Sequence, residues 1–270
     1  MEKELLPQSE NAVNINFMTF NIRTIAKADT NERAWVNRRA AVVDYLSKSD
    51  SEIICMQEVK KAQYEYIREN ISEKYEVLRF PNASDENAGG VAVAYNKEIF
   101  EVIKKKAFWL SETPDVESMG WDAAYKRICA NLTFKHKEKG VTVDVFNVHL
   151  DHIGEVARNK GIELIMDKVK KCDNPVFVTG DFNTKSTAKC YSIAADYLQD
   201  CQKTAAESDD GVTYTNWGEI EDFSSTPIDF GFASRKSMKP LKFKICRDKW
   251  NGNNFYSDHY AVKTTVQIMF

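Results

Sequence analysis

The chain has 270 residues, 43% of them hydrophobic and 29% charged, which fits one large domain or two small ones of ordinary globular composition. No apolar run approaches the roughly 20 residues that a membrane-spanning helix needs. The formal net charge of −3 argues against a protein that grips long nucleic acid non-specifically, because such binding usually shows a basic face. Nucleic acid is therefore a partner that the charge balance does not favour.

The first residues, MEKELLPQSENAVN, are polar and acidic and lack the apolar core of a signal peptide. We expect a flexible lead-in over residues 1–13 and one domain over residues 14–270. The protein is expected to be a soluble monomer, either cytoplasmic or exported with its signal absent from this chain. Six scattered cysteines without a CxxC pair are typical of free buried thiols.

Strands and helices alternate from residue 14 onward. Apolar spacing predicts, in chain order, a strand at 14–20, a helix at 33–48, a strand at 51–56, a helix at 60–71, strands at 91–95 and 100–110, a hairpin of 128–134 with 141–148, a helix at 154–171, a strand at 176–179, a helix at 186–195, and strands at 228–233, 241–246 and 261–268. Adjacent strand pairs mixed with single helices argue against a simple βαβ alternation. They suit two sheets packed face to face with helices outside.

Polar side chains recur where these apolar strands end. They are Asn21, Gln57, Glu58, His149, Asp151, His152, Asp181, Asn183, Asp229, Asp258 and His259. Repeated polar strand ends suggest a cluster on one rim of the sheets, which is a common place for a site. Carboxylate and amide oxygens suit a hard cation such as magnesium or manganese, and histidines suit proton transfer near neutral pH.

Six motifs occur in a fixed order along the chain: MTFNIR, MQE, NVHLDH, TGDFN, TPIDF and SDHYAV. Any single one occurs by chance, but the ordered set with its strand contexts resembles the endonuclease/exonuclease/phosphatase superfamily, which has the deoxyribonuclease I-like fold. The resemblance spans about residues 16–268. The segment WLSETPDVESMGWDAAYKRI further resembles a bacterial and fungal branch of that superfamily whose substrates are poorly defined.

The resemblance implies an α+β fold: a four-layer α/β/β/α sandwich of two packed mixed β-sheets with helices on both outer faces. It also implies hydrolysis of a phosphodiester or phosphomonoester by an activated water, with Mg²⁺ as cofactor and Mn²⁺ as a substitute. The substrate would be a phosphate ester that the sequence does not identify. A metal-dependent nuclease acting on DNA or RNA and a non-catalytic relative that binds a phosphorylated ligand are the alternatives.

Roles for the metal-side residues also follow from the resemblance. Glu58 of MQE would bind the metal directly. Asn21 would sit beside the metal, through water or the substrate phosphate, and Asp258 would lie close to it. Asp181 and Asn183 of GDFN would flank the attacking water and the phosphorus, so that Asn183 also contacts the substrate.

The remaining roles concern proton transfer and the phosphate. His259 would act as general base or contact a phosphate oxygen, and Asp229 would hold its ring. His149 would bind the phosphate or protonate the leaving oxygen. Arg127 would offer its guanidinium to the phosphate, which Arg geometry suits.

One position departs from the family pattern. Relatives often carry an acidic partner for the NVHL histidine just before the strand that here begins at Gly90, and our alignment puts Gly89 there. Asp85 or Glu86 could substitute from the preceding loop. This departure leaves the role of His149 less defined than that of His259.

The long connection between the strands at 100–110 and 128–134 is the other candidate region. Loops of such length often shape a binding site, so Trp121 is a candidate substrate contact. The alternative is that Trp109 and Trp121 pack against the sheet edge. Asp151 is open between a catalytic role and an N-cap of the helix that starts at Gly154.

Overall fold

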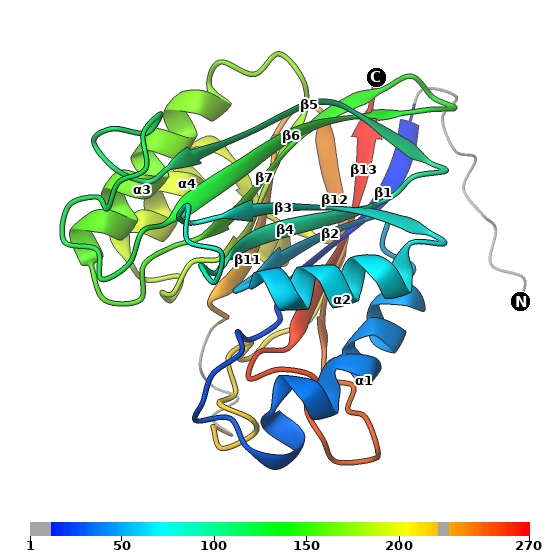
Figure 1. Ribbon diagram of the computed structural model, residues 1–270. Coiled ribbons are helices and arrows are strands. Elements are labelled where there is room, and N and C mark those ends of the chain that lie inside the picture. Colours follow the sequence, from blue (N-terminus) through cyan, green and yellow to red (C-terminus); the bar gives the residue numbers. More distant parts are fainter. Residues whose placement is uncertain (1–11, 221–226) are drawn as a thin grey trace, which may run out of the picture.

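Two β-sheets form the centre of the molecule, as Figure 1 shows for the computed structural model, which describes residues 12–220 and 227–270. The first sheet has the strand order β10 (Glu207–Ser208), β12 (Met238–Cys246), β13 (Ala261–Met269), β1 (Ala12–Asn21), β2 (Ile53–Gln57), β4 (Gly90–Asn96) and β3 (Tyr75–Pro81). The second has the order β5 (Phe100–Trp109), β6 (Ile128–His136), β7 (Thr142–His149), β8 (Val176–Asp181), β11 (Asp229–Ala233) and β9 (Gln199–Asp200). Both sheets are mixed, since β1–β2 and β7–β8 pair in parallel while β1–β13 and β6–β7 pair antiparallel.

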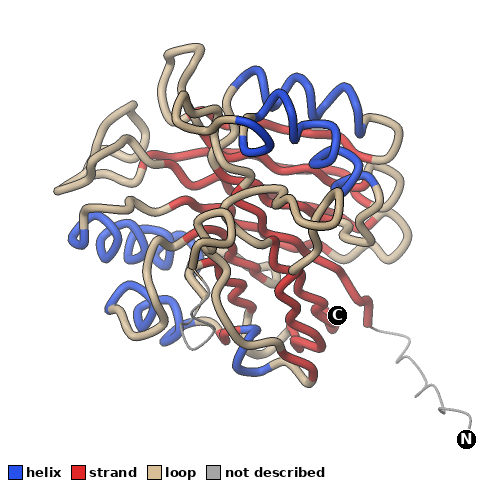
Figure 2. Tube along the Cα trace, turned by 90° about the horizontal axis from the view of Figure 1, so that it is seen from below, coloured by secondary structure: helices blue, strands red, loops and turns tan. Residues whose placement is uncertain are grey.

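Helices cover the outer face of each sheet. The helices are η1 (Asn31–Arg33), α1 (Trp35–Ser47), α2 (Lys61–Ile71), α3 (Glu155–Val169), α4 (Lys189–Tyr197) and the short α5 (Cys201–Thr204). The apolar sides of α1 and α2 pack on the first sheet, and those of α3 and α4 on the second. Figure 2 shows helices on both sides of the stacked strands. The predicted four-layer α/β/β/α sandwich is confirmed.

Side-chain alternation along the central strands explains why three apolar layers form. In β2, Ile53 and Cys55 point into the core between the sheets, while Ile54 and Met56 point to the core under α1 and α2. Between the sheets, the rings of Phe17 and Phe177 stack with their centroids 4.0 Å apart. Such strands are buried on both faces, which is why they are almost wholly apolar.

The elements predicted from the sequence are found with boundary shifts of a few residues, and the sequence missed β3 and the short elements η1, β9, α5 and β10. The β3 segment, YEVLRFP, carries charged residues, ends in proline and lies at the edge of its sheet, where an incompletely buried strand loses the apolar pattern. Most of the predicted lead-in over 1–13 lies outside the described residues, and β1 begins at Ala12. No helix in the described ranges is long and apolar enough to cross a membrane.

A buried polar bridge joins the two sheets beneath the strand ends. The Gln57 amide on β2 donates to the Asn147 side-chain oxygen on β7 at 2.8 Å. Asn147 in turn donates to the carbonyls of Met56 and Ala92 at 3.1 and 2.9 Å. Every partner of this bridge is buried, so each hydrogen bond compensates for a desolvated group.

Asn147→Ala is expected to lower the free energy of unfolding by about 3 kcal/mol, because it removes the acceptor of one Gln57 hydrogen bond and the side-chain donor to two buried carbonyls. Urea denaturation measures this loss. Asn70→Ala, at an exposed position on α2, is the matched control and should change stability by no more than about 0.5 kcal/mol. Equal stability of the two variants would mean that the bridge does not hold the sheets together.

Candidate active site

The polar strand ends meet at one rim of the sandwich. Parallel pairing aligns Asn21 with Gln57 at the ends of β1 and β2, and His149 with Asp181 at the ends of β7 and β8. Antiparallel pairing places Asp229, at the start of β11, opposite Asp181. Chain register alone therefore gathers residues that lie far apart in the sequence.

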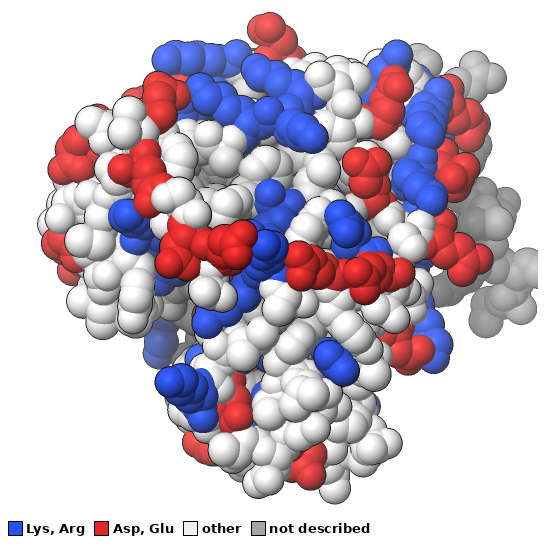
Figure 3. Space-filling view, viewed as in Figure 1, with Lys and Arg blue, Asp and Glu red and all other residues white. Residues whose placement is uncertain are grey.

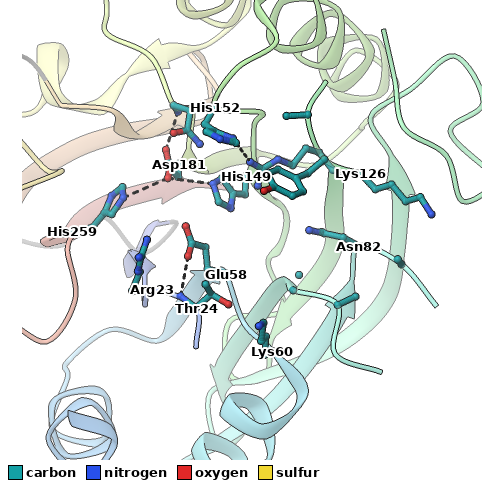
Figure 4. Close-up of a pocket in the computed structure, with 18 of the residues that line it drawn as sticks. Arg23, Thr24, Glu58, Lys60, Asn82, Lys126, His149, His152, Asp181 and His259 are labelled. Carbon is teal, nitrogen blue, oxygen red and sulfur yellow. Dashed lines mark hydrogen bonds and ion pairs between the residues drawn. The ribbon is translucent and has the colours of Figure 1, made fainter. Parts of the chain in front are cut away.

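A cavity of about 820 Å³ opens over this rim (Figure 4). Among the residues predicted for the site, Glu58, Arg127, His149, Asp181, Asn183, Asp258 and His259 line it. Asn21 and Asp229 are buried directly behind the lining residues and contact them. Trp121 is not among the described residues that line the cavity.

His259 is held between two carboxylates. Its Nδ1 lies 2.9 Å from Asp229 Oδ2, and its Nε2 lies 3.7 Å from Asp181 Oδ2. Burial favours the neutral ring, but the negative charges of Asp229 and Asp181 outweigh it and raise the pKa of His259 to about 10. Burial and the charge of Asp229 raise the pKa of Asp181 to about 7. The arrangement stabilises a proton on His259.

These three residues also bring ligand-type atoms within 4.8 Å of one another, an arrangement that could in principle hold a metal ion. The hydrogen bond between His259 and Asp229 argues for proton transfer, because it occupies Nδ1 of the ring and fixes its orientation.

His149 lies on the other side of Asp181. Its Nε2 is 3.4 Å from Asp181 Oδ2, as Figure 4 shows. Burial and the positive charge of Arg127 lower the pKa of His149 well below its usual range. The two loop carboxylates that could stand in for an acidic partner are engaged elsewhere: Asp85 accepts from the Asn87 backbone, and Glu86 pairs with Lys61.

Glu58 and Asp258 form the acidic side of the cavity, and Asn21 lies buried behind Glu58. Asn21 donates its amide to Glu58 Oε1 at 3.2 Å and to Asp181 Oδ2 at 3.0 Å, while its own oxygen accepts from the Arg23 backbone. Burial and the negative charge of Glu58 raise the pKa of Asp258, which means that the two carboxylates repel each other. Hard oxygen donors with excess negative charge fit a divalent cation at Glu58 and Asp258. The Asn21 oxygen is turned away and does not fit direct coordination.

Three residues of the rim adopt left-handed backbone conformations: Arg23 with φ 56°, Glu58 with φ 64° and Asn183 with φ 50°. Such conformations cost free energy for residues other than glycine and concentrate at functional sites. Each of these residues directly follows or lies two positions beyond the end of a strand, where the chain turns sharply to present its side chain to the cavity.

Arg38 fixes the loops that carry the acidic side. This buried guanidinium on α1 donates to the carbonyls of Ile22 at 2.7 Å, Arg23 at 2.8 Å and Tyr256 at 2.9 Å. Burial lowers the pKa of Arg38 to about 10. The contact ties the loop after β1 to the loop before Asp258, so α1 sets the spacing of two chain segments more than 200 residues apart.

Asp151 organises the opposite wall. Its carboxylate accepts from the backbone of Ala124, Tyr125 and Gly154 at 3.1, 3.2 and 2.8 Å, and its Oδ2 lies 3.3 Å from Arg127 Nε. The N-cap position of α3 is Gly154, and Asp151 binds the backbone N–H of that residue from three positions earlier in the chain. Asp151 is buried behind the wall and holds it in place.

Burial opposes ionisation of Asp151, but the hydrogen bonds from Gly154 and Ala124 and the charge of Arg127 outweigh it and lower its pKa to about 2. A lowered pKa stabilises the fold above the unfolded value near 4, and this contribution is lost as pH falls from 4 toward 2. Asp151→Asn is therefore expected to cost about 2 kcal/mol at pH 7, and the difference from wild type should narrow below pH 4. Urea denaturation at several pH values measures this, with exposed Asp167→Asn as control. A difference that is constant with pH would contradict this account.

Several lining residues were not predicted from the sequence. Arg23 pairs with Asp29 through Nε at 3.0 Å and with Asp258 through Nη1 at 3.4 Å. Its position two residues after Asn21 in the NIR motif was the available signal. Lys60, Asn82 and Tyr125 come from loops whose sequences carry no comparable pattern.

Known proteins share this fold. The chain matches the Endonuclease/Exonuclease/phosphatase family over residues 18–259. An endonuclease/exonuclease/phosphatase family protein from Bacteroides thetaiotaomicron is 28% identical, with a TM-score of 0.88 and coverage of 96% of this chain and 97% of that one. The mannosyl-6-phosphatase of Bacteroides thetaiotaomicron is 28% identical, with a TM-score of 0.85 and coverage of 93% and 99%.

A viral protein gives a shorter match. An uncharacterized protein of Acanthamoeba polyphaga mimivirus is 30% identical over 161 residues, which span 56% of this chain and 59% of that protein. The family match, in contrast, reaches from the motif that ends β1 to the histidine paired with Asp229. Motif order, sandwich and cavity rim agree over this span, and the chain belongs to the Endonuclease/Exonuclease/phosphatase family.

Proposed function

We propose that the protein hydrolyses a phosphate ester with an activated water and a divalent cation, Mg²⁺ in the first place and Mn²⁺ as a substitute. The observation that carries the proposal is the His259–Asp229 pair, 2.9 Å apart, which opens on the same cavity as the Glu58 carboxylate. A proton acceptor and a cation site on one cavity are the two requirements for attack of water on an anionic ester.

His259 takes the proton of the attacking water, once the ring has lost its own proton, or contacts a phosphate oxygen. In the first role, Asp229 and Asp181 stabilise the protonated ring that forms. In the second role, the protonated ring donates to the phosphate. Asp229 serves both roles, because its hydrogen bond to Nδ1 directs Nε2 toward Asp181 and the cavity.

On the far side of Asp181, His149 and Arg127 serve the phosphate and the leaving group. His149 binds a phosphate oxygen or protonates the leaving oxygen, and the guanidinium of Arg127 offsets the charge that develops on phosphorus oxygens. Asn183 is held by its own hydrogen bonds, from its backbone to Asp181 and from its amide to the Leu150 carbonyl. It lines the cavity together with Asp181, the carboxylate that lies near both His149 and His259.

The cation would be held by Glu58, with Asp258 close by and water completing its shell. When bound, it supplies Lewis-acid polarisation of the phosphate and lowers the pKa of nearby water. Asn21 keeps Glu58 and Asp181 apart and oriented, through one hydrogen bond to each. Arg23 holds Asp258 from the opposite side.

A phosphomonoester is the first substrate to test, because a solved structure 28% identical to this chain carries the name mannosyl-6-phosphatase. Nucleic acid is the second substrate class to test. On the face shown in Figure 3, basic side chains gather over β5 and β6 and elsewhere alternate with acidic ones, so this face offers no continuous track for a phosphate backbone.

A hydrolysis panel with magnesium or manganese tests the proposal. It contains p-nitrophenyl phosphate, bis-p-nitrophenyl phosphate, sugar 6-phosphates, a supercoiled plasmid and a labelled oligonucleotide. We expect release of phosphate from small monoesters above any cutting of nucleic acid. Strong nicking with weak action on small esters would reverse that order. Magnesium binding without turnover of any member would favour a non-catalytic relative.

A further inference from the structure

Tyr125 is an exposed aromatic side chain on the wall of the cavity. It is 61% exposed and lines the cavity together with Met119, which is 55% exposed. A single exposed aromatic residue needs no explanation by itself. The way in which this residue is held, however, distinguishes it from a mobile surface side chain.

Contacts with Asp151 and His152 hold the backbone of Tyr125 and one face of its ring. Its backbone N–H donates to the buried Asp151 carboxylate at 3.2 Å. Its ring stacks on His152, with centroids 5.5 Å apart and an interplanar angle of 21°. The Arg127 guanidinium lies 5.8 Å from the ring centroid. An exposed ring held in this way is ready to bind without a large loss of conformational entropy.

The position of the ring relates it to the reacting phosphate. Arg127 Nη2 lies 3.3 Å from His152 Nδ1, and both side chains are close enough to His149 to lower its pKa. Tyr125 therefore lies next to the residues proposed to bind the phosphate, because it stacks on His152, which contacts Arg127. Figure 4 shows His149 and His152 on one side, with Asn82 and Lys60 across the cavity. A leaving group extending outward from the phosphate would pass between these two walls.

We propose that Tyr125 is the stacking subsite for the leaving group, so that the site prefers phosphate esters whose alcohol carries a ring with an apolar face, either an aryl group or the C–H face of a sugar. The proposal rests on the proposed function, because it assigns the leaving group of that reaction. Aromatic stacking supplies the attraction, and the opposite wall offers the Asn82 amide and the Lys60 ammonium to hydroxyl groups.

The test compares KM and kcat of wild type, Tyr125→Phe and Tyr125→Ala on p-nitrophenyl phosphate, glucose 6-phosphate and glycerol 3-phosphate, which has no ring. We expect Tyr125→Ala to raise KM for the two ring esters about fivefold to tenfold and to leave glycerol 3-phosphate within about twofold. Tyr125→Phe keeps the ring and should behave as wild type. Tyr197→Ala removes a tyrosine that is 47% exposed on α4, outside the cavity, and is the matched control.

Equal losses on all three esters would overturn the subsite, since they would point to a disturbed Arg127. Unchanged KM for the ring esters would overturn it as well. Calorimetric titration of the same esters gives a readout that needs no turnover. If wild type binds ring esters more tightly and Tyr125→Ala loses this preference, the subsite stands even where hydrolysis fails. If none of the three esters is hydrolysed, this result counts against the proposed function but not against the stacking subsite.

Discussion

Replacing His259 by alanine is expected to lower kcat by about 10³-fold, because it removes the proton acceptor and leaves Asp229 and Asp181 without the positive ring between them. KM should change far less, since Arg127 and the cation side still bind the phosphate. Steady-state rates on the best member of the hydrolysis panel measure both parameters.

The control for this variant is His136→Ala, which removes a histidine of β6 that is not among the residues lining the cavity. It should keep kcat within about twofold. Circular dichroism must show that both variants fold, because His259 is buried. A His259→Ala protein that folds and keeps more than a tenth of the wild-type kcat would exclude His259 from the chemical step.

Glu58→Gln is expected to raise the magnesium concentration needed for half-maximal activity on the order of 100-fold, because the amide keeps the shape of the side chain and loses its charge. The hydrogen bond from the Thr24 backbone to Glu58 Oε2, at 2.8 Å, can be kept by an amide oxygen, so the loop after β1 should hold its conformation. Magnesium titrations of initial rate measure the shift.

Glu65→Gln changes an exposed carboxylate on α2 in the same way and serves as the control. It should leave the magnesium titration unchanged. Glu58 does not bind the cation if its variant reaches half-maximal activity at the wild-type magnesium concentration. If saturating magnesium restores the full kcat of Glu58→Gln, Glu58 acts as a cation ligand and not in proton transfer.

The sequence predicted the layers because the central strands are buried on both faces. β2 and the first half of β8 carry apolar residues at nearly every position, and the polar residues at their ends mark the rim. The pairing of His259 with Asp229 came from the family resemblance, and the contact is present at 2.9 Å. The local hydrophobic pattern did not predict β3, because exposure at the edge of the sheet removes the apolar periodicity of this strand.

The walls of the cavity were beyond sequence analysis for a different reason. Tyr125 and Lys60 reach the cavity through the packing of loops, which depends on contacts between distant segments. Asp151 illustrates this, because its carboxylate gathers backbone N–H groups from the 120s loop and from the start of α3. Trp121 is the converse case. Its loop is the correct one, yet its neighbours and not its own side chain line the cavity.

The most direct test of a metal-dependent hydrolytic site is the initial rate of phosphate release by wild type after removal of metal with EDTA, followed by titration with magnesium. The panel member that wild type cleaves fastest serves as substrate, and His259→Ala gives the background rate. We predict a rate at that background in EDTA and a saturable return as magnesium is added. A full rate in EDTA, or equal rates for wild type and His259→Ala in magnesium, would contradict the account.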